Sequence, residues 1–148
     1  MNYITTNHRG GLGNVMFKLA ASISLAIDNE VEYIFSNEFL RPVDRITTKG
    51  DPDYRRFYNN VLRNVKFIDK LPGHYFVHTE TQFNYKEIPY VKGINLLLDG
   101  YFQSEKYFEN NKQFIKDLFG PNQEITERVL VNLPDVYNYA SIHIRRGD

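Results

Sequence analysis

The chain has 148 residues, enough for one domain with an ordinary hydrophobic core, and its 42% hydrophobic and 24% charged residues are typical of a globular protein. Eighteen Lys and Arg balance eighteen Asp and Glu, so the chain lacks the basic surface that nucleic-acid binding needs, and we expect no nucleic-acid partner. Cysteine is absent, which excludes disulfide bonds and thiolate chemistry within the chain.

The N-terminal residues predict the opening of an α/β sheet. Residues 2–6 form a strand candidate, and a glycine-rich segment follows it. Apolar side chains recur at helical spacing over 15–29, and 31–35 is a second strand candidate. This strand–helix–strand unit predicts a parallel sheet with flanking helices. Neither a signal-peptide core nor a run of about 18 apolar residues is present, so we expect a soluble, cytoplasmic chain without a membrane span.

The rest of the chain is less regular at first and then orderly again. Residues 36–58 favour a loop, with a helical piece at 54–62, and short extended segments follow at 65–68, 75–78 and 83–85. A buried strand, two helices and a last strand are predicted after these, at 94–98, 104–119, 124–133 and 139–145. Ser104 is suited to cap the first of these helices, and Gly120-Pro121 to end it.

The glycine-rich segment Gly10-Gly11-Leu12-Gly13-Asn14 lies between the first strand and the first helix. Glycines let a ligand approach the backbone, and the N–H groups at a helix start favour an anion. The dinucleotide-binding motif is excluded because Met16 stands where its last glycine would be, and no P-loop lysine follows. The segment indicates either a ligand contact or a tight turn, with Asn14 as a helix cap or a partner of a sugar hydroxyl.

Two further segments follow predicted strands. Gly100-Tyr101-Phe102-Gln103 is typical of a capped helix start, and alternatively of a cleft wall in which Tyr101 and Gln103 face a sugar. The chain ends with His143-Ile144-Arg145-Arg146-Gly147-Asp148, where two guanidinium groups match the oxygens of a diphosphate. The alternative there is a solvated strand edge with a salt bridge to Asp148.

Metal chemistry is not expected. The four histidines, at positions 8, 74, 78 and 143, have no metal-ligand spacing, since Pro72-Gly73 argues against a helix that would bring His74 and His78 together. We therefore predict neither a metal site nor a cofactor.

Taken together, three segments resemble the alpha-1,2-fucosyltransferases of glycosyltransferase family 11. They are Gly10 to Asn14 with Met16-Phe17, Gly100 to Phe108, and His143 to Asp148. Members of that family are roughly twice as long, so the chain resembles their N-terminal half. The resemblance implies a Rossmann-like domain of a GT-B glycosyltransferase at 1–136, and the first strand and donor motif of a second, nucleotide-sugar domain at 137–148.

The resemblance also implies roles for particular residues. Arg145 and Arg146 would hold the diphosphate of GDP-fucose and offset charge on the departing GDP, in place of a metal. His143 and Asp148 would line the donor site with them. Gly10, Gly11, Gly13 and Asn14 would face the cleft, and Tyr101 and Gln103 would lie on the acceptor side. The chain departs from the family at Val15, where a glutamine is usual, and no general base is evident among its carboxylates.

The sequence therefore predicts an inverting, metal-independent transferase that moves L-fucose from GDP-fucose to a galactoside hydroxyl of a glycan, or the N-terminal part of such an enzyme. Its partners would be the nucleotide sugar, the glycan acceptor and the missing C-terminal domain. The alternative is a non-catalytic remnant or a sugar-binding domain. An unrelated nucleotide-binding domain is a third hypothesis, which explains neither the terminal arginines nor the segment at 100–108.

Overall fold

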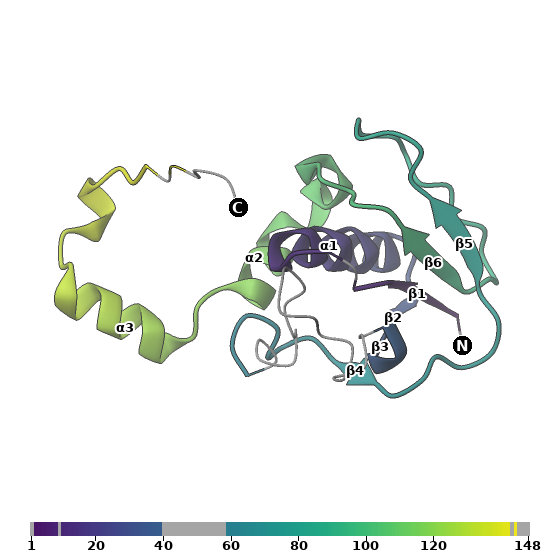
Figure 1. Cartoon of the computed structure of the whole chain (residues 1–148), viewed down its shortest axis with the longest axis horizontal. Helices are drawn as coiled ribbons and strands as arrows, with labels where there is room; N and C mark the ends of the chain where they lie inside the picture. The colour runs from purple at the N-terminus through teal and green to yellow at the C-terminus, as the bar shows by residue number, and fades with distance from the viewer. Residues whose placement is uncertain (1, 9, 40–58, 143, 145–148) are drawn as a thin grey trace.

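The computed structural model describes residues 2–8, 10–39, 59–142 and 144, and it has the α/β architecture that the sequence predicts. Its main sheet has four parallel strands in the order β2-β1-β6-β5 (Figure 1). They are β1 (Tyr3–Thr6), β2 (Glu32–Tyr33), β5 (Phe76–Thr79) and β6 (Leu96–Asp99). Because β1, β6 and β5 are parallel, their carboxyl ends lie at one edge of the sheet.

Two further strands form a separate, two-stranded parallel sheet. β3 (Phe35–Ser36) pairs with β4 (Phe67–Ile68), and the short turn Asn37–Phe39 follows β3. Only Ile34 separates β2 from β3, and its N–H donates to the carbonyl of Ile4 at 3.1 Å. The strand predicted at 31–35 is therefore present in two pieces, of which β2 pairs with β1 and β3 with β4.

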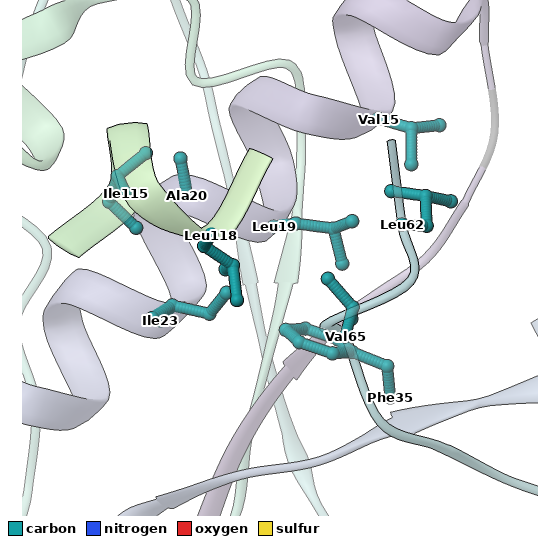
Figure 2. Packing of buried hydrophobic residues seen from close by; sticks show 9 residues of the cluster. All are labelled: Val15, Leu19, Ala20, Ile23, Phe35, Leu62, Val65, Ile115 and Leu118. Atoms are coloured by element: carbon teal, nitrogen blue, oxygen red, sulfur yellow. The ribbon is translucent and has the colours of Figure 1, made fainter. Parts of the chain in front are cut away.

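Helix α1 (Leu12–Asp28) lies across one face of the main sheet (Figure 1). Its small and apolar side chains face inward at helical spacing, as the sequence predicts. One side of the helix packs on segments from both halves of the chain (Figure 2). The helix contributes Val15, Leu19, Ala20 and Ile23 to this cluster, and the rest of the chain contributes Phe35, Leu62, Val65, Ile115 and Leu118. Each fully buried aliphatic side chain in such a cluster contributes about 1.5–3 kcal/mol.

The other side of α1 covers the sheet itself. Ala21 and Ala26 pack against Ile4 of β1 and against Leu96 and Leu98 of β6. Alanines at these positions allow the helix to approach the strands closely, which fixes the start of α1 beside the carboxyl ends of β1 and β6. The α/β prediction with a parallel sheet and a flanking helix is confirmed.

The helix predicted at 104–119 is wrong in its first half. The structure has two single turns of 3₁₀ helix, Glu105–Tyr107 and Glu109–Asn111, and then α2 (Lys112–Phe119). Phe108 leaves the helical region with φ −137°, and Asn111 donates to Asp28 Oδ1 and to Ser24 Oγ on α1. These tertiary contacts override the local helix preference.

The chain beyond α2 is exposed. α3 (Gln123–Asn132) is capped by Asn122, whose side chain accepts from the N–H of Ile125, and none of its residues is buried. A last 3₁₀ turn spans Val136–Asn138. The strand predicted at 139–145 is not formed over 139–142 or at 144, where no described strand pairs with it, and its remaining positions lie outside the described residues.

Two smaller expectations also differ from the structure. Residues 83–85, predicted as a short strand or extended chain, form no strand; they lie at a bend of the chain and are exposed. The helical piece predicted at 54–62 falls outside the described residues as far as position 58, and 59–62 form turns. Within the described ranges, no helix is both long enough and apolar enough to cross a membrane.

Candidate functional site

Polar side chains meet where β1 and β6 end. Asn7 follows β1 and Asp99 closes β6, and the Asn7 side-chain amide donates to Asp99 Oδ1 at 2.6 Å. Lys18 of α1 completes the group, because its Nζ donates to Asn7 Oδ1 at 2.9 Å. The amide of Asn7 is thus oriented by an ammonium on one side and a carboxylate on the other.

Lys18 is buried, with 3% of its surface exposed. A buried ammonium needs hydrogen-bond acceptors and favourable electrostatics to offset the loss of water. Besides Asn7, the Nζ lies 5.3 Å from the centre of the Tyr101 ring, in a cation–π arrangement. Lys18 is absent from the residues predicted from the sequence, although it is the one charged residue in the apolar run 15–27, and that isolation was the available signal.

The glycine-rich segment forms the turn into α1. Gly10 has φ +110°, where a Cβ would lie 3.2 Å from Asn14 Cβ, so this position requires glycine. Gly11 is the N-cap residue, and a Cβ at Gly11 or Gly13 would have no atom within 4 Å. These two glycines leave open space over the first turn of the helix.

The structure brings together two of the segments that the sequence singles out. The Gln103 side-chain amide donates to Asn14 Oδ1 at 2.6 Å, across 89 positions of sequence. The expectation that Asn14 caps α1 is wrong, because the helix begins at Leu12 and Asn14 makes no capping bond. Its side chain instead faces the turn that follows β6, with Gln103 exposed.

That turn is held by a carboxylate that the sequence analysis also missed. Glu80, one residue after β5, accepts from the backbone N–H of Tyr101 at 2.6 Å and from that of Phe102 at 3.1 Å. Phe102 is buried and has φ +50°, an uncommon backbone conformation for a non-glycine residue. A Cβ at Gly100 would collide with the Glu80 side chain, so glycine allows this close approach.

Tyr101 is presented by this turn at the surface. Its ring stacks on that of Phe83, with centroids 6.2 Å apart and planes 25° apart, and both rings are substantially exposed. Exposed aromatic faces next to hydrogen-bonding amides suit a sugar ring, whose C–H groups are attracted to the negative face of the π system.

His8 lies beside the group but is enclosed by aromatic rings. The centroids of Phe35, Phe39 and Phe67 are 5.2–6.3 Å from its own, and neither ring nitrogen has a hydrogen-bond partner among the described residues. Burial, and secondarily the charge of Lys18, lowers the pKa of His8 to about 4. His8 is therefore neutral at neutral pH and supports the loop rather than donating protons.

The predicted donor residues are at the C-terminal end of the sequence. His143, Arg145, Arg146 and Asp148 lie outside the described residues, as does Arg9 in the glycine-rich loop. Their assignment to a diphosphate therefore stays a prediction. Ile144 between them is exposed.

Comparison with known proteins gives one curated relative. The chain is 25% identical over 162 residues to an alpha-1,2-colitosyltransferase of Escherichia coli, in a match that covers all of this chain and 56% of the relative. The chain thus spans about half the length of this relative. No family model matches the sequence, and no solved structure matches it. The similarity supports the predicted class, a glycosyltransferase, and reaches from one end of the chain to the other.

Proposed function

We propose that the chain is the acceptor-side part of a fucosyltransferase-like glycosyltransferase, or that enzyme itself, which transfers L-fucose from GDP-fucose to a galactoside hydroxyl with inversion and without a metal. The observation that carries this proposal is the similarity of the whole chain to a colitosyltransferase. The convergence of the glycine-rich turn and the 100–103 turn at one edge of a parallel sheet supports it, because ligands of open α/β sheets bind at that edge.

The acceptor side would be formed by described residues. Gln103 and Asn14 offer amide groups to sugar hydroxyls, and the stacked pair Phe83–Tyr101 offers exposed apolar ring surface beside them. The open backbone at Gly11 and Gly13 leaves room for a substrate over the start of α1, where the helix dipole favours negative charge.

The reaction needs a base. The acceptor oxygen forms a bond to the anomeric carbon while the bond from that carbon to the phosphate oxygen breaks, GDP leaves with the electron pair, and the hydroxyl proton is taken up. Among the described residues at this edge, the Glu80 carboxylate is engaged by two backbone N–H groups, whereas Asp99 Oδ2 makes no hydrogen bond with any of them. We assign the base to Asp99, next to Asn7 and Lys18.

The donor side would be formed by Arg145 and Arg146, which would neutralise charge on the leaving diphosphate, with His143 and Asp148 beside them. Electrostatic stabilisation of this kind commonly contributes more to catalysis than any other effect, and here it would replace a metal ion. The name of the relative specifies a colitosyl group, so GDP-colitose is the competing donor.

The test is a transfer assay on the full gene product, including any residues that are encoded after Asp148. GDP-fucose and GDP-colitose are offered with methyl β-galactoside, for the wild type and for Arg145→Ala, Arg146→Ala and the control Arg128→Ala on exposed α3. We expect either arginine variant to lose about 100-fold or more in kcat, as for removal of one charge-stabilising donor. Unchanged kinetics in both would refute the donor assignment.

A second candidate function is a sugar-binding domain without catalysis. It is favoured by the chemistry of the described site, where the amides of Asn14 and Gln103 lie beside the stacked rings of Phe83 and Tyr101. Calorimetry separates the two: GDP binding that GMP does not reproduce supports a donor site, whereas galactoside binding without any GDP binding at millimolar concentration supports the sugar-binding domain.

A further inference from the structure

Two aromatic pairs join the same two segments of the chain. Phe83 stacks on Tyr101 beside the candidate site, and two residues further on Tyr85 packs against Tyr107, with ring centroids 4.9 Å apart. Phe83, Tyr85 and Tyr101 are 73%, 43% and 42% exposed. These rings form a row that begins at the Asn14–Gln103 contact and continues along the 101–107 segment.

The row ends in a groove of about 510 Å³, because Tyr85 and Tyr107 also line that groove. Its other walls are the last turns of α1, the 87–90 segment and residues 106–110. The volume is in the range of small-molecule binding sites. The candidate site lies at the carboxyl ends of the strands, beside the start of α1. The groove is lined by the last turns of α1, at the other end of the helix, and is therefore distinct from the candidate site.

The rings of the groove are fixed before any ligand binds. The Tyr107 hydroxyl accepts from the N–H of Lys86 at 3.2 Å, and the Tyr90 hydroxyl donates to the carbonyl of Ile94 at 3.0 Å. The Tyr107 ring also meets Phe102 edge to face, at 5.3 Å between centroids. Rings that are already ordered lose little conformational entropy on binding, which favours affinity.

The chemistry of the walls selects an uncharged, hydroxyl-rich ligand. Planar carboxylate and amide groups surround the rings: Asp28, Asn29, Glu87, Glu109 and Asn110. Three carboxylates against the single cation Lys106 disfavour a phosphate or another anion. No three His, Asp or Glu side chains come together to hold a metal in the part of the chain that the structure describes. Ring faces beside paired polar groups fit the C–H face and the hydroxyls of a sugar.

We propose that the groove and the aromatic row bind the inner sugars of an uncharged oligosaccharide acceptor, whose terminal galactoside lies at Asn14 and Gln103. This inference rests on the proposed function and names its acceptor class: a chain of several sugars rather than a free monosaccharide. Tyr85 is a specificity-determining residue in this arrangement, because it belongs to both the row and the groove.

The test compares a neutral, galactose-terminated tetrasaccharide with methyl β-galactoside. For the wild type we expect a KM about tenfold lower for the tetrasaccharide, which corresponds to roughly one or two additional hydrogen bonds or stacking contacts. Tyr85→Ala and Asn110→Ala bring the ratio of the two KM values close to one. Tyr137→Ala, on a distant and highly exposed tyrosine, keeps the wild-type ratio. An unchanged ratio in both groove variants overturns the proposal.

A binding measurement without donor separates this inference from the proposed function. In saturation-transfer NMR, the inner sugars of the tetrasaccharide receive signal from the wild type and lose it in Tyr85→Ala, whether or not transfer occurs. Absence of that signal in the wild type, or equal signal in the variant, overturns the groove assignment. Binding with no transfer to either acceptor retains the groove and refutes the enzymatic proposal.

Discussion

The Lys18–Asn7–Asp99 group shows how one amide can organise a charged site. Asn7 accepts from Lys18 through its oxygen and donates to Asp99 through its nitrogen, so only one orientation of the amide satisfies both partners. The hydrogen bond from Asn7 uses Oδ1 of Asp99 and thereby fixes the carboxylate plane. A group that must take up a proton at a defined place benefits from this restraint, since a misplaced base loses much of its effect.

Asp99→Asn tests the assignment of the base. The substitution keeps an oxygen that can accept from Asn7 and removes the proton acceptor, so we expect kcat to fall about 100-fold or more while the KM of the galactoside changes little. Steady-state kinetics measures both parameters, and a urea titration verifies the fold. Asp135→Asn, on an exposed carboxylate near the last 3₁₀ turn, is the control and retains wild-type rates. A kcat within threefold of the wild type would remove Asp99 from the mechanism.

Because the pKa of His8 is lowered in the folded protein, we predict that the free energy of unfolding depends on pH. This pKa is about 4 in the folded protein and 6.5 when unfolded, so between these values the unfolded chain binds a proton that the folded chain does not. Stability is therefore complete above pH 6.5 and falls as the pH approaches 4, by roughly 3 kcal/mol at most.

The variant His8→Leu isolates this effect. The leucine remains apolar among the three phenylalanines and has no titratable group, so the difference in urea midpoint between His8→Leu and the wild type should grow from pH 7 to pH 4. His74→Leu, at an exposed position, follows the wild type across the range. Parallel curves for the wild type and His8→Leu would show that the histidine ring is hydrated.

At the scale of elements, Glu80 couples the end of β5 to the turn after β6. Glu80→Ala leaves two backbone N–H groups without their acceptor and releases the strained Phe102, so we expect a loss of about 2–3 kcal/mol in the free energy of unfolding. The KM for the galactoside should rise as well, because Tyr101 and Gln103 lose their position.

Partial rescue distinguishes this role from simple packing. Glu80→Gln retains one oxygen acceptor and should recover about half of the lost stability and part of the KM effect. Glu124→Ala, on exposed α3, should leave both quantities at their wild-type values. Equal stability of Glu80→Ala and the wild type would contradict the view that this carboxylate holds the turn.

The elements that the sequence predicts well are those whose pattern and packing agree. α1 has small and apolar residues on the faces that meet the sheet and the second cluster, so its periodicity is a direct record of burial. The segment at 104–119 fails for the opposite reason. Its break at Phe108 follows from contacts of Asn111 with α1, which no local pattern encodes.

In the candidate site, too, some residues could be predicted from the sequence and others could not. Asn14 and Gln103 could be singled out because each lies in a segment that leads from a strand of the parallel sheet into a helical turn, and the topology then brings them together. Glu80 and Asp99 could not, since an acidic residue at the end of a short strand is ordinary in sequence. Their importance comes from the pairing of β5 with β6, which aligns Thr79 with Asp99 and sets Glu80 beside the next turn.

At the scale of the whole molecule, the described residues form a packed region up to about Asn122 and an exposed region after it (Figure 1). Arg63 still bonds to the carbonyl of Gly120, and Asn64 to that of Leu118. No described residue after Asn122 is buried, while Ile125, Val129 and Leu133 present an apolar face along α3. The division at 136/137 that the resemblance implies remains a proposal beside this change in burial.

The contrast in burial implies that the residues after Asn122 contribute little to the stability of the sheet. A chain shortened to residues 1–122 should unfold in urea within about 0.5 kcal/mol of the 148-residue chain, because none of the described residues that it loses is buried and such changes have small effects. It should also be less prone to self-association, since the apolar face of α3 is gone. A chain shortened to 1–111 is the control: it loses Ile115 and Leu118 from the cluster in Figure 2, each worth about 2–5 kcal/mol when truncated to alanine, and should not fold at 25 °C. If the 1–122 chain proved as unstable as this control, the sheet would depend on contacts made by the segment after α2.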